Sequence, residues 1–519
     1  MSRARTATSL GLILLVAIVT RLAVLPGSTE RSQEADGPHL MNVARCFERG
    51  QGFSNPAAWP AWMKPARLPM PETFKEPGYP FAIAALAPRL GEFRAAVLIS
   101  FLAGLLMPLA LFGLARSIGL DRGEATLAAI LAATSPLAIL MSVRVTVDSL
   151  FPALLTLAFF LAAWRRGEDA PSRPWWADAL TGVAAGLAFL VRGQALVAVP
   201  ALAVLLATRR PRRGVPVGLS LAVGSAILIA SPFLIRNLRL FGVPFYSDVG
   251  AYGLWPYVDH LTFSHGLDRP PAPLAFALHH VPEVLRHVGE SVVRFCVYAL
   301  PGEITGNPIW VPAFAVGVLL SLGRWRRFLG LWLYLAATVV FIFAINWDGR
   351  YFTSTVPLWS LFTALGAMWI ARAVGTLPIA GPLRGGHLLL ATLVVAVIVQ
   401  TEVTRRRVAH YKAPETDAAI AEAPFLRAHL APGESVMVVT TSFWSWFADR
   451  PSVHLVIAGD QALEETVRRL RVRYAALPTS RLPEFAERYP GRHLPRILLV
   501  DHVDPLRDVT VFRVAGAGL

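Results

Sequence analysis

The sequence predicts an all-α polytopic membrane protein with about 11 transmembrane helices and a small C-terminal α/β extracytoplasmic domain. Of its 519 residues, 55% are hydrophobic and only 16% are charged, whereas about a quarter of the residues in a soluble domain are charged. The apolar residues form long blocks separated by short Arg clusters, which is typical of membrane spans joined by cytoplasmic loops. The formal net charge of +15 is therefore attributed to membrane topology, and no nucleic-acid partner is expected.

Candidate spans follow from the requirement for about 20 mostly apolar residues per crossing. The first apolar run follows a basic start, which is also typical of a cleaved signal peptide. It lacks a clear small-x-small cleavage site, and Arg21 interrupts its far end, so we expect a retained helix. The predicted spans are 8–25, 94–115, 124–143, 148–164, 178–192, 194–208, 215–235, 308–323, 328–345, 352–372 and 386–402.

The Arg distribution orients these spans. With the N-terminus in the cytoplasm, alternate short loops are Arg-rich, as the positive-inside rule requires. The long segments 26–93 and 236–307 are then outer loops, and an odd number of spans leaves the C-terminal region outside. We therefore expect a multi-pass protein of the cell inner (plasma) membrane. The predicted cytoplasmic loops are Arg116–Arg122, Arg165–Arg173, Arg209–Arg213, Arg324–Arg327 and Arg372–Arg384.

The C-terminal region differs in character from the rest, so we divide the chain into a transmembrane domain, 1–408, and an extracytoplasmic α/β domain, 409–519. Short strands are predicted at 435–440, 453–457, 496–500 and 509–514, with a helix at 462–472. In the first outer loop, the apolar segment Tyr79–Leu90 is too short to span and predicts an interfacial or re-entrant helix. Cys46 and Cys296 both fall outside the cytoplasm, where a disulfide or two free thiols are compatible with the sequence.

The outer loops carry the candidate chemistry. In the first loop, Glu34 and Asp36 lie close to the membrane surface, where a carboxylate can act as a general base. An ordinary solvated loop acid is the alternative interpretation. Further along this loop, Lys75 could bind a lipid phosphate as a point charge. Glu76 could instead mark a helix start, favoured by the helix dipole.

A second set of charges occupies the very short outer loops. Arg144, Arg192 and Arg350 oppose the positive-inside bias, and Arg236 ends the seventh predicted span. Together they would bind a phosphate or diphosphate through bidentate guanidinium contacts. The alternative for Arg144 is a structural pair with Asp148, four residues on, and boundary Arg residues can also simply snorkel.

Several short motifs occur in a fixed order. They are Asp36-Gly-Pro-His-Leu-Met-Asn-Val-Ala-Arg with Gly50-Gln-Gly-Phe, then Glu76-Pro-Gly-Tyr-Pro, Val147-Asp148-Ser-Leu, Gly186-Leu-Ala-Phe-Leu-Val-Arg192, Ser231-Pro-Phe-Leu-Ile-Arg236-Asn237 and Gly349-Arg350-Tyr351. Over residues 8–402 this set resembles the GT-C membrane glycosyltransferases, in particular the branch of protein O-mannosyltransferases and lipid A aminoarabinose transferases.

The resemblance implies a polyprenyl-phosphate-linked sugar donor and an inverting transfer at the outer face to an acceptor protein, lipid or glycan. It implies Asp36 as the base, with Glu34 as the fallback. The implied donor-binding residues are Lys75, Glu76, Tyr79, Arg144, Asp148, Arg192, Arg236, Asn237, Arg350 and Tyr351. In aminoarabinose transferases a Lys directly precedes the Pro, whereas here Glu76 holds that place, which argues against aminoarabinose as the sugar. No cofactor is specified, and a divalent metal stays open. A transporter or lipid flippase is the alternative function.

Overall fold

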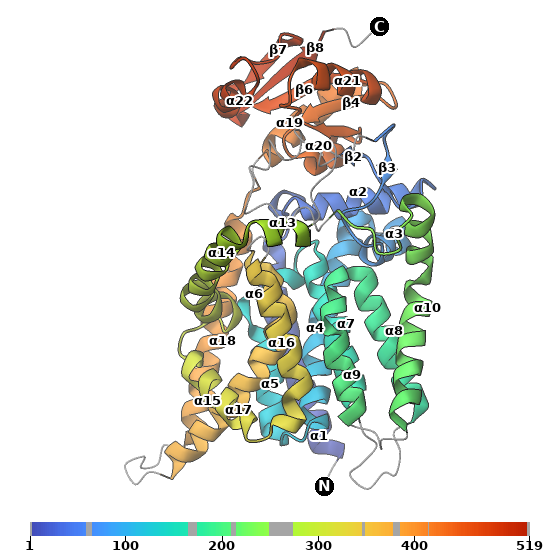
Figure 1. Ribbon diagram of the computed structural model, residues 1–519. Helices are drawn as coiled ribbons and strands as arrows, with labels where there is room; N and C mark the ends of the chain where they lie inside the picture. Colours follow the sequence, from blue (N-terminus) through green and yellow to red (C-terminus); the bar gives the residue numbers. More distant parts are fainter. Residues whose placement is uncertain are drawn as a thin grey trace.

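The computed structural model describes residues 3–58, 65–164, 174–208, 214–248, 273–344, 348–376, 385–413 and 415–515. A long helical bundle carries a small sheet domain at one end, and the N-terminus lies at the opposite end of the bundle (Figure 1). This confirms the predicted fold class of a mostly helical membrane protein with a C-terminal sheet region. The predicted cytoplasmic clusters 165–173 and 209–213 lie outside the described residues.

The bundle consists of apolar helices whose outer faces suit lipid. Leu15, Leu228 and Ile398 are each more than half exposed, as expected where hydrocarbon replaces water as the solvent. The bundle helices are α1 (Arg3–Val24), α4 (Glu92–Ser117), α5 (Arg122–Thr134), α6 (Pro136–Ser142), α7 (Val147–Ala163), α8 (Trp175–Val191), α9 (Val199–Thr208), α10 (Val215–Phe241), α15 (Trp310–Leu322), α16 (Trp325–Ala344), α17 (Val356–Gly375) and α18 (Gly385–His410).

Six helices in the described ranges are long and apolar enough to cross a membrane, or seven if the pair α5 and α6, bent by 58°, forms one span. Four shorter apolar helices, of 10–17 residues, occupy positions where further spans were predicted: Val147–Ala163, Trp175–Val191, Gly193–Thr208 and Trp310–Leu322. The predicted number of eleven spans thus stays a prediction.

Small residues allow the helices to pack closely. A Cβ atom built on Gly317 of α15 would lie 1.7 Å from the carbonyl oxygen of Phe362 in α17. Only glycine fits such a crossing, which is the usual role of small residues between membrane helices. Arg21 is fully buried in α1 and donates from Nη1 to the Ala133 carbonyl in α5 at 2.9 Å. The charge that interrupts the far end of the first predicted span therefore lies inside the bundle.

The first outer loop is folded rather than extended. It contains α2 (Asp36–Glu48) and α3 (Gly78–Leu90), which lie between the end of the bundle and the sheet domain (Figure 1). The helix predicted at Tyr79–Leu90 is α3, whereas α2 was not predicted. The short elements of this loop are η1 (Leu25–Gly27), η2 (Glu30–Ser32), β1 (Ser54–Asn55), β2 (Ala57–Ala58) and β3 (Met70–Pro71).

The second long loop and the turns between spans are also largely helical. In the described part of the segment 236–307, α13 (Pro273–His279) and α14 (Val281–Arg294) precede a π-helix, η7 (Phe295–Ile304). Two 3₁₀ helices, η4 (Gly193–Ala198) and η8 (Gly349–Thr355), follow directly on Arg192 and Asp348. These two turns place Arg192 and Arg350 at the end of the bundle that carries the sheet domain.

The C-terminal region forms a six-stranded mixed sheet in the order β2-β5-β4-β6-β8-β7. Strands β2, β5, β4 and β6 are parallel neighbours, and β8 pairs antiparallel with β6 and β7. The helix predicted at 462–472 ends at Leu470, because Val472 already belongs to a strand. The elements are α19 (Thr416–His429), β4 (Ser435–Val438), α20 (Thr441–Ala448), β5 (Ser452–His454), α21 (Asp460–Leu470), β6 (Val472–Pro478), η10 (Thr479–Arg481), α22 (Leu482–Arg488), β7 (Leu498–Asp504), η11 (Pro505–Arg507) and β8 (Val509–Val514).

One strand of this sheet comes from the first outer loop. Ala57 and Ala58 form β2, which pairs in parallel with Ser452 and Val453 of β5. The sheet is therefore not confined to residues after the predicted boundary at 409, because the loop 26–93 contributes one of its edge strands.

Candidate active site

The candidate site begins at the N-terminus of α2. Asp36 is the first residue of this helix, and Glu34 lies two residues before it. The positive end of a helix dipole favours a carboxylate in this position. The side chains of Asp36 and Glu34 are 22% and 31% exposed, so both carboxylates remain within reach of a ligand.

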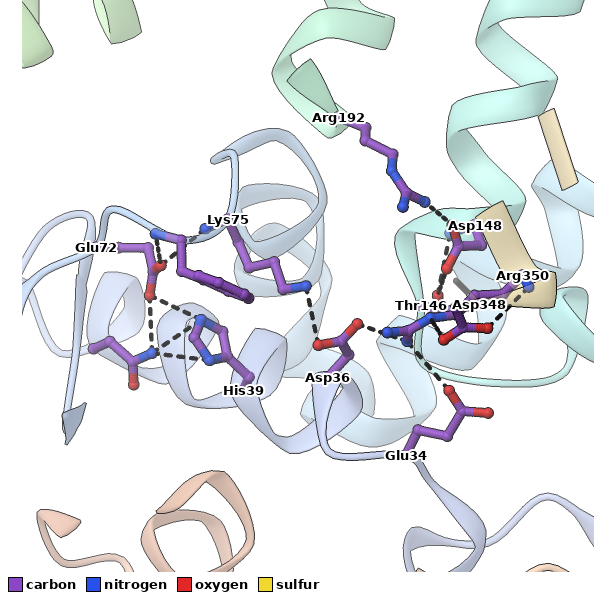
Figure 2. A network of polar contacts seen from close by, with 12 residues as sticks. Glu34, Asp36, His39, Glu72, Lys75, Thr146, Asp148, Arg192, Asp348 and Arg350 are labelled. Atoms are coloured by element: carbon purple, nitrogen blue, oxygen red, sulfur yellow. Dashed lines mark hydrogen bonds and ion pairs between the residues drawn. The ribbon is translucent and has the colours of Figure 1, made fainter. Parts of the chain in front are cut away.

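Asp36 lies between two cations that come from distant parts of the chain (Figure 2). Its Oδ1 is 3.0 Å from Nζ of Lys75, and its Oδ2 accepts a hydrogen bond from Nη1 of Arg350 at 2.7 Å. Burial alone would raise the pKa of Asp36, but the charges of Arg350 and Lys75 outweigh it and hold the pKa well below its usual range. Asp36 is therefore ionised, and its charge is matched from both sides.

Glu34 joins the same ionic network. Its two oxygens accept hydrogen bonds from Nη1 of Arg144 and, at 3.2 Å, from Nη1 of Arg350. Arg350 also contacts Asp348, with Nε 2.7 Å from Oδ2. The Arg144 guanidinium stacks on Tyr411, 4.3 Å from its ring centre. Arg350 thus touches three carboxylates and is the centre of the network.

Asp148 pairs with Arg192 and Arg144 with Glu34, so the alternative interpretation of Arg144 and Asp148 as a structural pair is wrong. Asp148 lies in the first turn of α7, where Thr146 donates to its Oδ2 at 2.9 Å, while its Oδ1 accepts from Arg192 Nη1. Tyr351 lies between Arg192 and Arg350. Its ring centre is 4.9 Å from the Arg192 guanidinium and 5.6 Å from the Arg350 guanidinium.

Glu76 contacts the backbone of the turn that follows α8. Its Oε1 accepts a hydrogen bond from the Gly193 amide at 2.8 Å, which fixes the turn that carries Arg192. Burial raises the pKa of Glu76 above its ordinary value. Its position suits an orienting role for Arg192 more directly than a contact with a ligand.

Charge is balanced within this ionic network. Each of the four cations contacts at least one of four carboxylates, so no member of the set is left with a free charge in the described residues. An incoming anion therefore competes with these carboxylates for the cations. The cations are Lys75, Arg144, Arg192 and Arg350, and the carboxylates are Glu34, Asp36, Asp148 and Asp348.

Sequence reasoning missed a buried cluster that supports Lys75 (Figure 2). Glu72 is only 1% exposed, and its Oε1 accepts from the amides of Phe74 and Lys75 at 2.6 and 2.9 Å. Its Oε2 is 2.9 Å from Nε2 of His39 and accepts from Asn55 at 2.8 Å. Glu72 therefore shapes the turn from which Lys75 reaches Asp36. No sequence motif marks this residue.

We expect replacement of Glu72 by Gln to destabilise the first outer loop. Burial would raise the pKa of Glu72, but His39 and the hydrogen bonds lower it to about 2. The stabilisation is thus complete above the pKa of an unfolded Glu, about 4.3, and is lost as pH falls through about 2. At neutral pH, Glu72→Gln should cost about 1–3 kcal/mol. Thermal unfolding in detergent measures this loss, and an unchanged Tm at neutral pH contradicts it.

Tyr79, Arg236 and Asn237 were also predicted to bind the donor, but their hydrogen bonds are made outside the ionic network. Tyr79 is fully buried, and its hydroxyl hydrogen bonds with the Ala96 carbonyl at 2.9 Å and with Ser100 at 2.7 Å. Arg236 donates to the Phe53 carbonyl at 3.0 Å and to the Asn237 side chain at 2.9 Å. Asn237 in turn donates to the carbonyls of residues 244 and 246. The predicted grouping of Arg236 with the other three Arg is therefore not observed in the contacts of the described residues.

The described residues contain no group of three or more His, Cys, Asp or Glu side chains arranged to hold a metal ion. Cys46 is buried and Cys296 is exposed, and both are free thiols. Of the two alternatives compatible with the sequence, the structure has free thiols.

The helical bundle with its C-terminal sheet domain has a fold of the GT-C type. Residues 75–235 match the family described as dolichyl-phosphate-mannose-protein mannosyltransferase. This segment includes Lys75, Glu76, Arg144, Asp148 and Arg192 but neither Asp36 nor Arg350. No curated protein matches the chain in sequence.

Solved structures show the same fold at low sequence identity. ArnT from Cupriavidus metallidurans in the apo state superposes with a TM-score of 0.63 at 16% identity, with 98% of both chains covered. The same protein bound to undecaprenyl phosphate gives a TM-score of 0.60 at 14% identity, covering 98% of this chain and 99% of that one. The oligosaccharyltransferase AglB from Archaeoglobus fulgidus, in complex with an inhibitory peptide and a dolichol-phosphate, gives 0.63 at 13% identity, covering 100% and 75%.

Proposed function

We propose that this protein is a membrane glycosyltransferase that moves a sugar from a polyprenyl-phosphate-linked donor to an acceptor. The observation that carries the proposal is the Asp36 carboxylate, which lies in contact with both Lys75 and Arg350 at the domain-bearing end of the bundle. A base and a set of cations in one place are what transfer from a lipid phosphate requires, because the leaving group develops negative charge.

The comparisons support this class of reaction. The description of the matched family names dolichyl-phosphate-mannose. Two similar structures hold undecaprenyl phosphate and a dolichol-phosphate. The fold alone does not specify chemistry, so the assignment rests on the fold together with the charged site.

In the proposed inverting reaction, the acceptor oxygen or nitrogen forms a bond to the anomeric carbon of the donor sugar. The bond between that carbon and the phosphate oxygen breaks, and its electron pair leaves with the polyprenyl phosphate. Asp36 takes the acceptor proton, for which it must lie within about 3 Å of the acceptor atom. Glu34 is the alternative base, since it lies in the same network.

Phosphate binding and base activation are coupled in this scheme. A donor phosphate that contacts Lys75 or Arg350 draws that cation away from Asp36, because the network has no spare charge. Asp36 then becomes more basic when the donor is in place. Arg144 and Arg192 complete the cation set, and Glu76 orients the turn before Gly193.

This coupling predicts a pH effect of Lys75→Gln. Loss of the Lys75 charge raises the depressed pKa of Asp36 toward its ordinary value. The acid limb of kcat/KM, which reports the free enzyme, should therefore move to higher pH. The matched control is Lys412→Gln, because the Lys412 side chain is 78% exposed and remote from Asp36 in its contacts. An acid limb that stays in place contradicts the assignment of Asp36 as base.

The proposed setting is the outer face of the cytoplasmic membrane, with the N-terminus in the cytoplasm and the sheet domain outside. The N-terminus and the sheet domain lie at opposite ends of the bundle, as this topology requires (Figure 1). A protein, a lipid or a glycan can serve as acceptor, and the donor's polyprenyl chain lies among membrane lipids.

The direct test is reconstitution of the purified chain in liposomes with polyprenyl-phosphate sugars and candidate acceptors, followed by mass spectrometry. We expect release of polyprenyl phosphate together with a glycosylated acceptor, and comparison of glycans and glycolipids with and without the gene identifies the acceptor class. Movement of the lipid donor across the bilayer without sugar transfer would instead favour the alternative of a flippase.

A further inference from the structure

The C-terminal domain packs against α2, the helix that begins with Asp36. In Figure 1, α2 lies directly between the bundle and the domain, close to α20. Asn42 of α2 donates to the Ser442 carbonyl of α20 at 3.0 Å, in a buried contact. The domain also takes up β2 of the same loop, because Ala57 and Ala58 pair with β5. One short stretch of the domain, residues 442–453, thus contacts two elements of the first outer loop, α2 and β2.

Arg45 is the central contact of this interface. It lies nine residues after Asp36, about 13 Å along the same helix. Its guanidinium stacks 4.0 Å from the Trp446 ring centre and donates to the Trp446 carbonyl at 3.2 Å. Nη1 is 3.3 Å from Asp449, and Nε is 3.0 Å from Glu92, the first residue of α4. A single side chain therefore joins α2 to the domain and to the bundle.

Arg49 reinforces the same contact, since its Nη2 lies 2.9 Å from both oxygens of Asp449. It is 49% exposed, whereas Arg45 is only 17% exposed. Water and salt screen the outer pair more strongly than the inner one. Arg45 is for this reason the residue through which the interface acts on α2.

We propose that Arg45 is a positioning residue through which the C-terminal domain holds α2, and with it Asp36, in the geometry required for sugar transfer. The inference rests on the proposed function, because it assigns Arg45 a role in setting the rate of that reaction. Arg45 itself contacts neither Lys75 nor Arg350 in the described structure and acts only through the helix. The domain is then a part of the catalytic apparatus rather than an appended module.

The test compares Arg45→Ala with Arg45→Lys in the full-length, membrane-reconstituted protein. A displacement of about 1 Å at a catalytic group can cost about a hundredfold in rate. We expect Arg45→Ala to lower kcat about tenfold to a hundredfold, with little change in the KM for donor. Arg45→Lys keeps the charge but not the fork-shaped contact, so it should recover part of the rate.

The matched control is Arg473→Gln, which breaks a 2.7 Å pair with Glu434 inside the domain. It should change the stability of the domain without changing kcat. If Arg45→Ala behaves in the same way, with altered stability and unaltered kcat, the positioning role is overturned.

Hydrogen exchange separates this proposal from the proposed function. In Arg45→Ala, the amides of α2 should exchange faster than in the wild type, while those of α20 change less. This measurement needs no substrate, so it decides whether the domain holds α2 even if the wild type transfers no sugar. Unchanged exchange in α2 overturns the proposal, whereas absence of transfer by the wild type together with faster exchange in Arg45→Ala overturns the proposed function and the role in its rate, but not the contact by which the domain holds α2.

Discussion

Replacement of Asp36 by Asn should lower kcat for sugar transfer by about 10²–10⁴-fold, the usual contribution of a general base. Asn has nearly the same shape as Asp but cannot accept the acceptor proton. Arg350 keeps Glu34 and Asp348 as partners in this variant, so the network should remain folded. Transfer from a polyprenyl-phosphate sugar in reconstituted membranes measures the effect.

The control for charge loss is Asp417→Asn, because the ion pairs of Asp417 within the described residues are long and exposed, at 4.0 Å to Arg31 and 3.9 Å to Lys412. It should leave the rate unchanged. Glu34→Gln tests the fallback base and should cost less than Asp36→Asn. Wild-type transfer by Asp36→Asn at normal protein levels would contradict Asp36 as base, and a larger loss in Glu34→Gln would transfer the role to Glu34.

The sequence predicted where the charged residues lie better than it predicted which of them form ion pairs. Arg144, Arg192 and Arg350 sit in very short loops, so span counting alone places them at one end of the bundle. Their partners depend on tertiary structure. Glu34 meets Arg144 across 110 residues of chain, and Asp148 meets Arg192 across 44. The alternative of a pair between the sequence neighbours Arg144 and Asp148 is wrong, because Asp148 lies in the first turn of α7 and contacts Arg192 after α8 instead.

The elements that escaped prediction lack local signals. The helix α2 contains Gly37 and Pro38 near its start and has no continuous apolar run, so its sequence resembles a loop. The strand β2 has only two residues and exists because β5 offers an edge. Glu72 is buried by Asn55 and His39, which approach from other elements. Each of these features depends on contacts with residues far away in the sequence, so a short stretch of sequence does not predict it.

Arg350→Ala should have the second large effect, on both stability and rate. Arg350 contacts three carboxylates, at 2.7 Å from Asp36, 3.2 Å from Glu34 and 2.7 Å from Asp348. Its removal leaves partly buried acids without their shared cation, which typically costs about 3–5 kcal/mol. If Arg350 also meets the leaving phosphate, kcat should fall by about 10²–10³-fold.

The effects of Arg350 on stability and on rate can be separated with a matched variant, Arg372→Ala. Arg372, at the last turn of α17, also joins two carboxylates, with 2.5 Å to Asp121 and 3.3 Å to Glu124, but at the opposite end of the bundle. Arg372→Ala should lower the unfolding temperature without changing kcat per folded molecule. Arg350→Lys should keep part of the stability, yet lose much of the rate, because an ammonium cannot contact a phosphate and Asp36 as a fork. If Arg350→Ala lowers stability while kcat per folded molecule stays at the wild-type value, Arg350 is only a structural cation, and the leaving phosphate must meet Lys75, Arg144 or Arg192 instead.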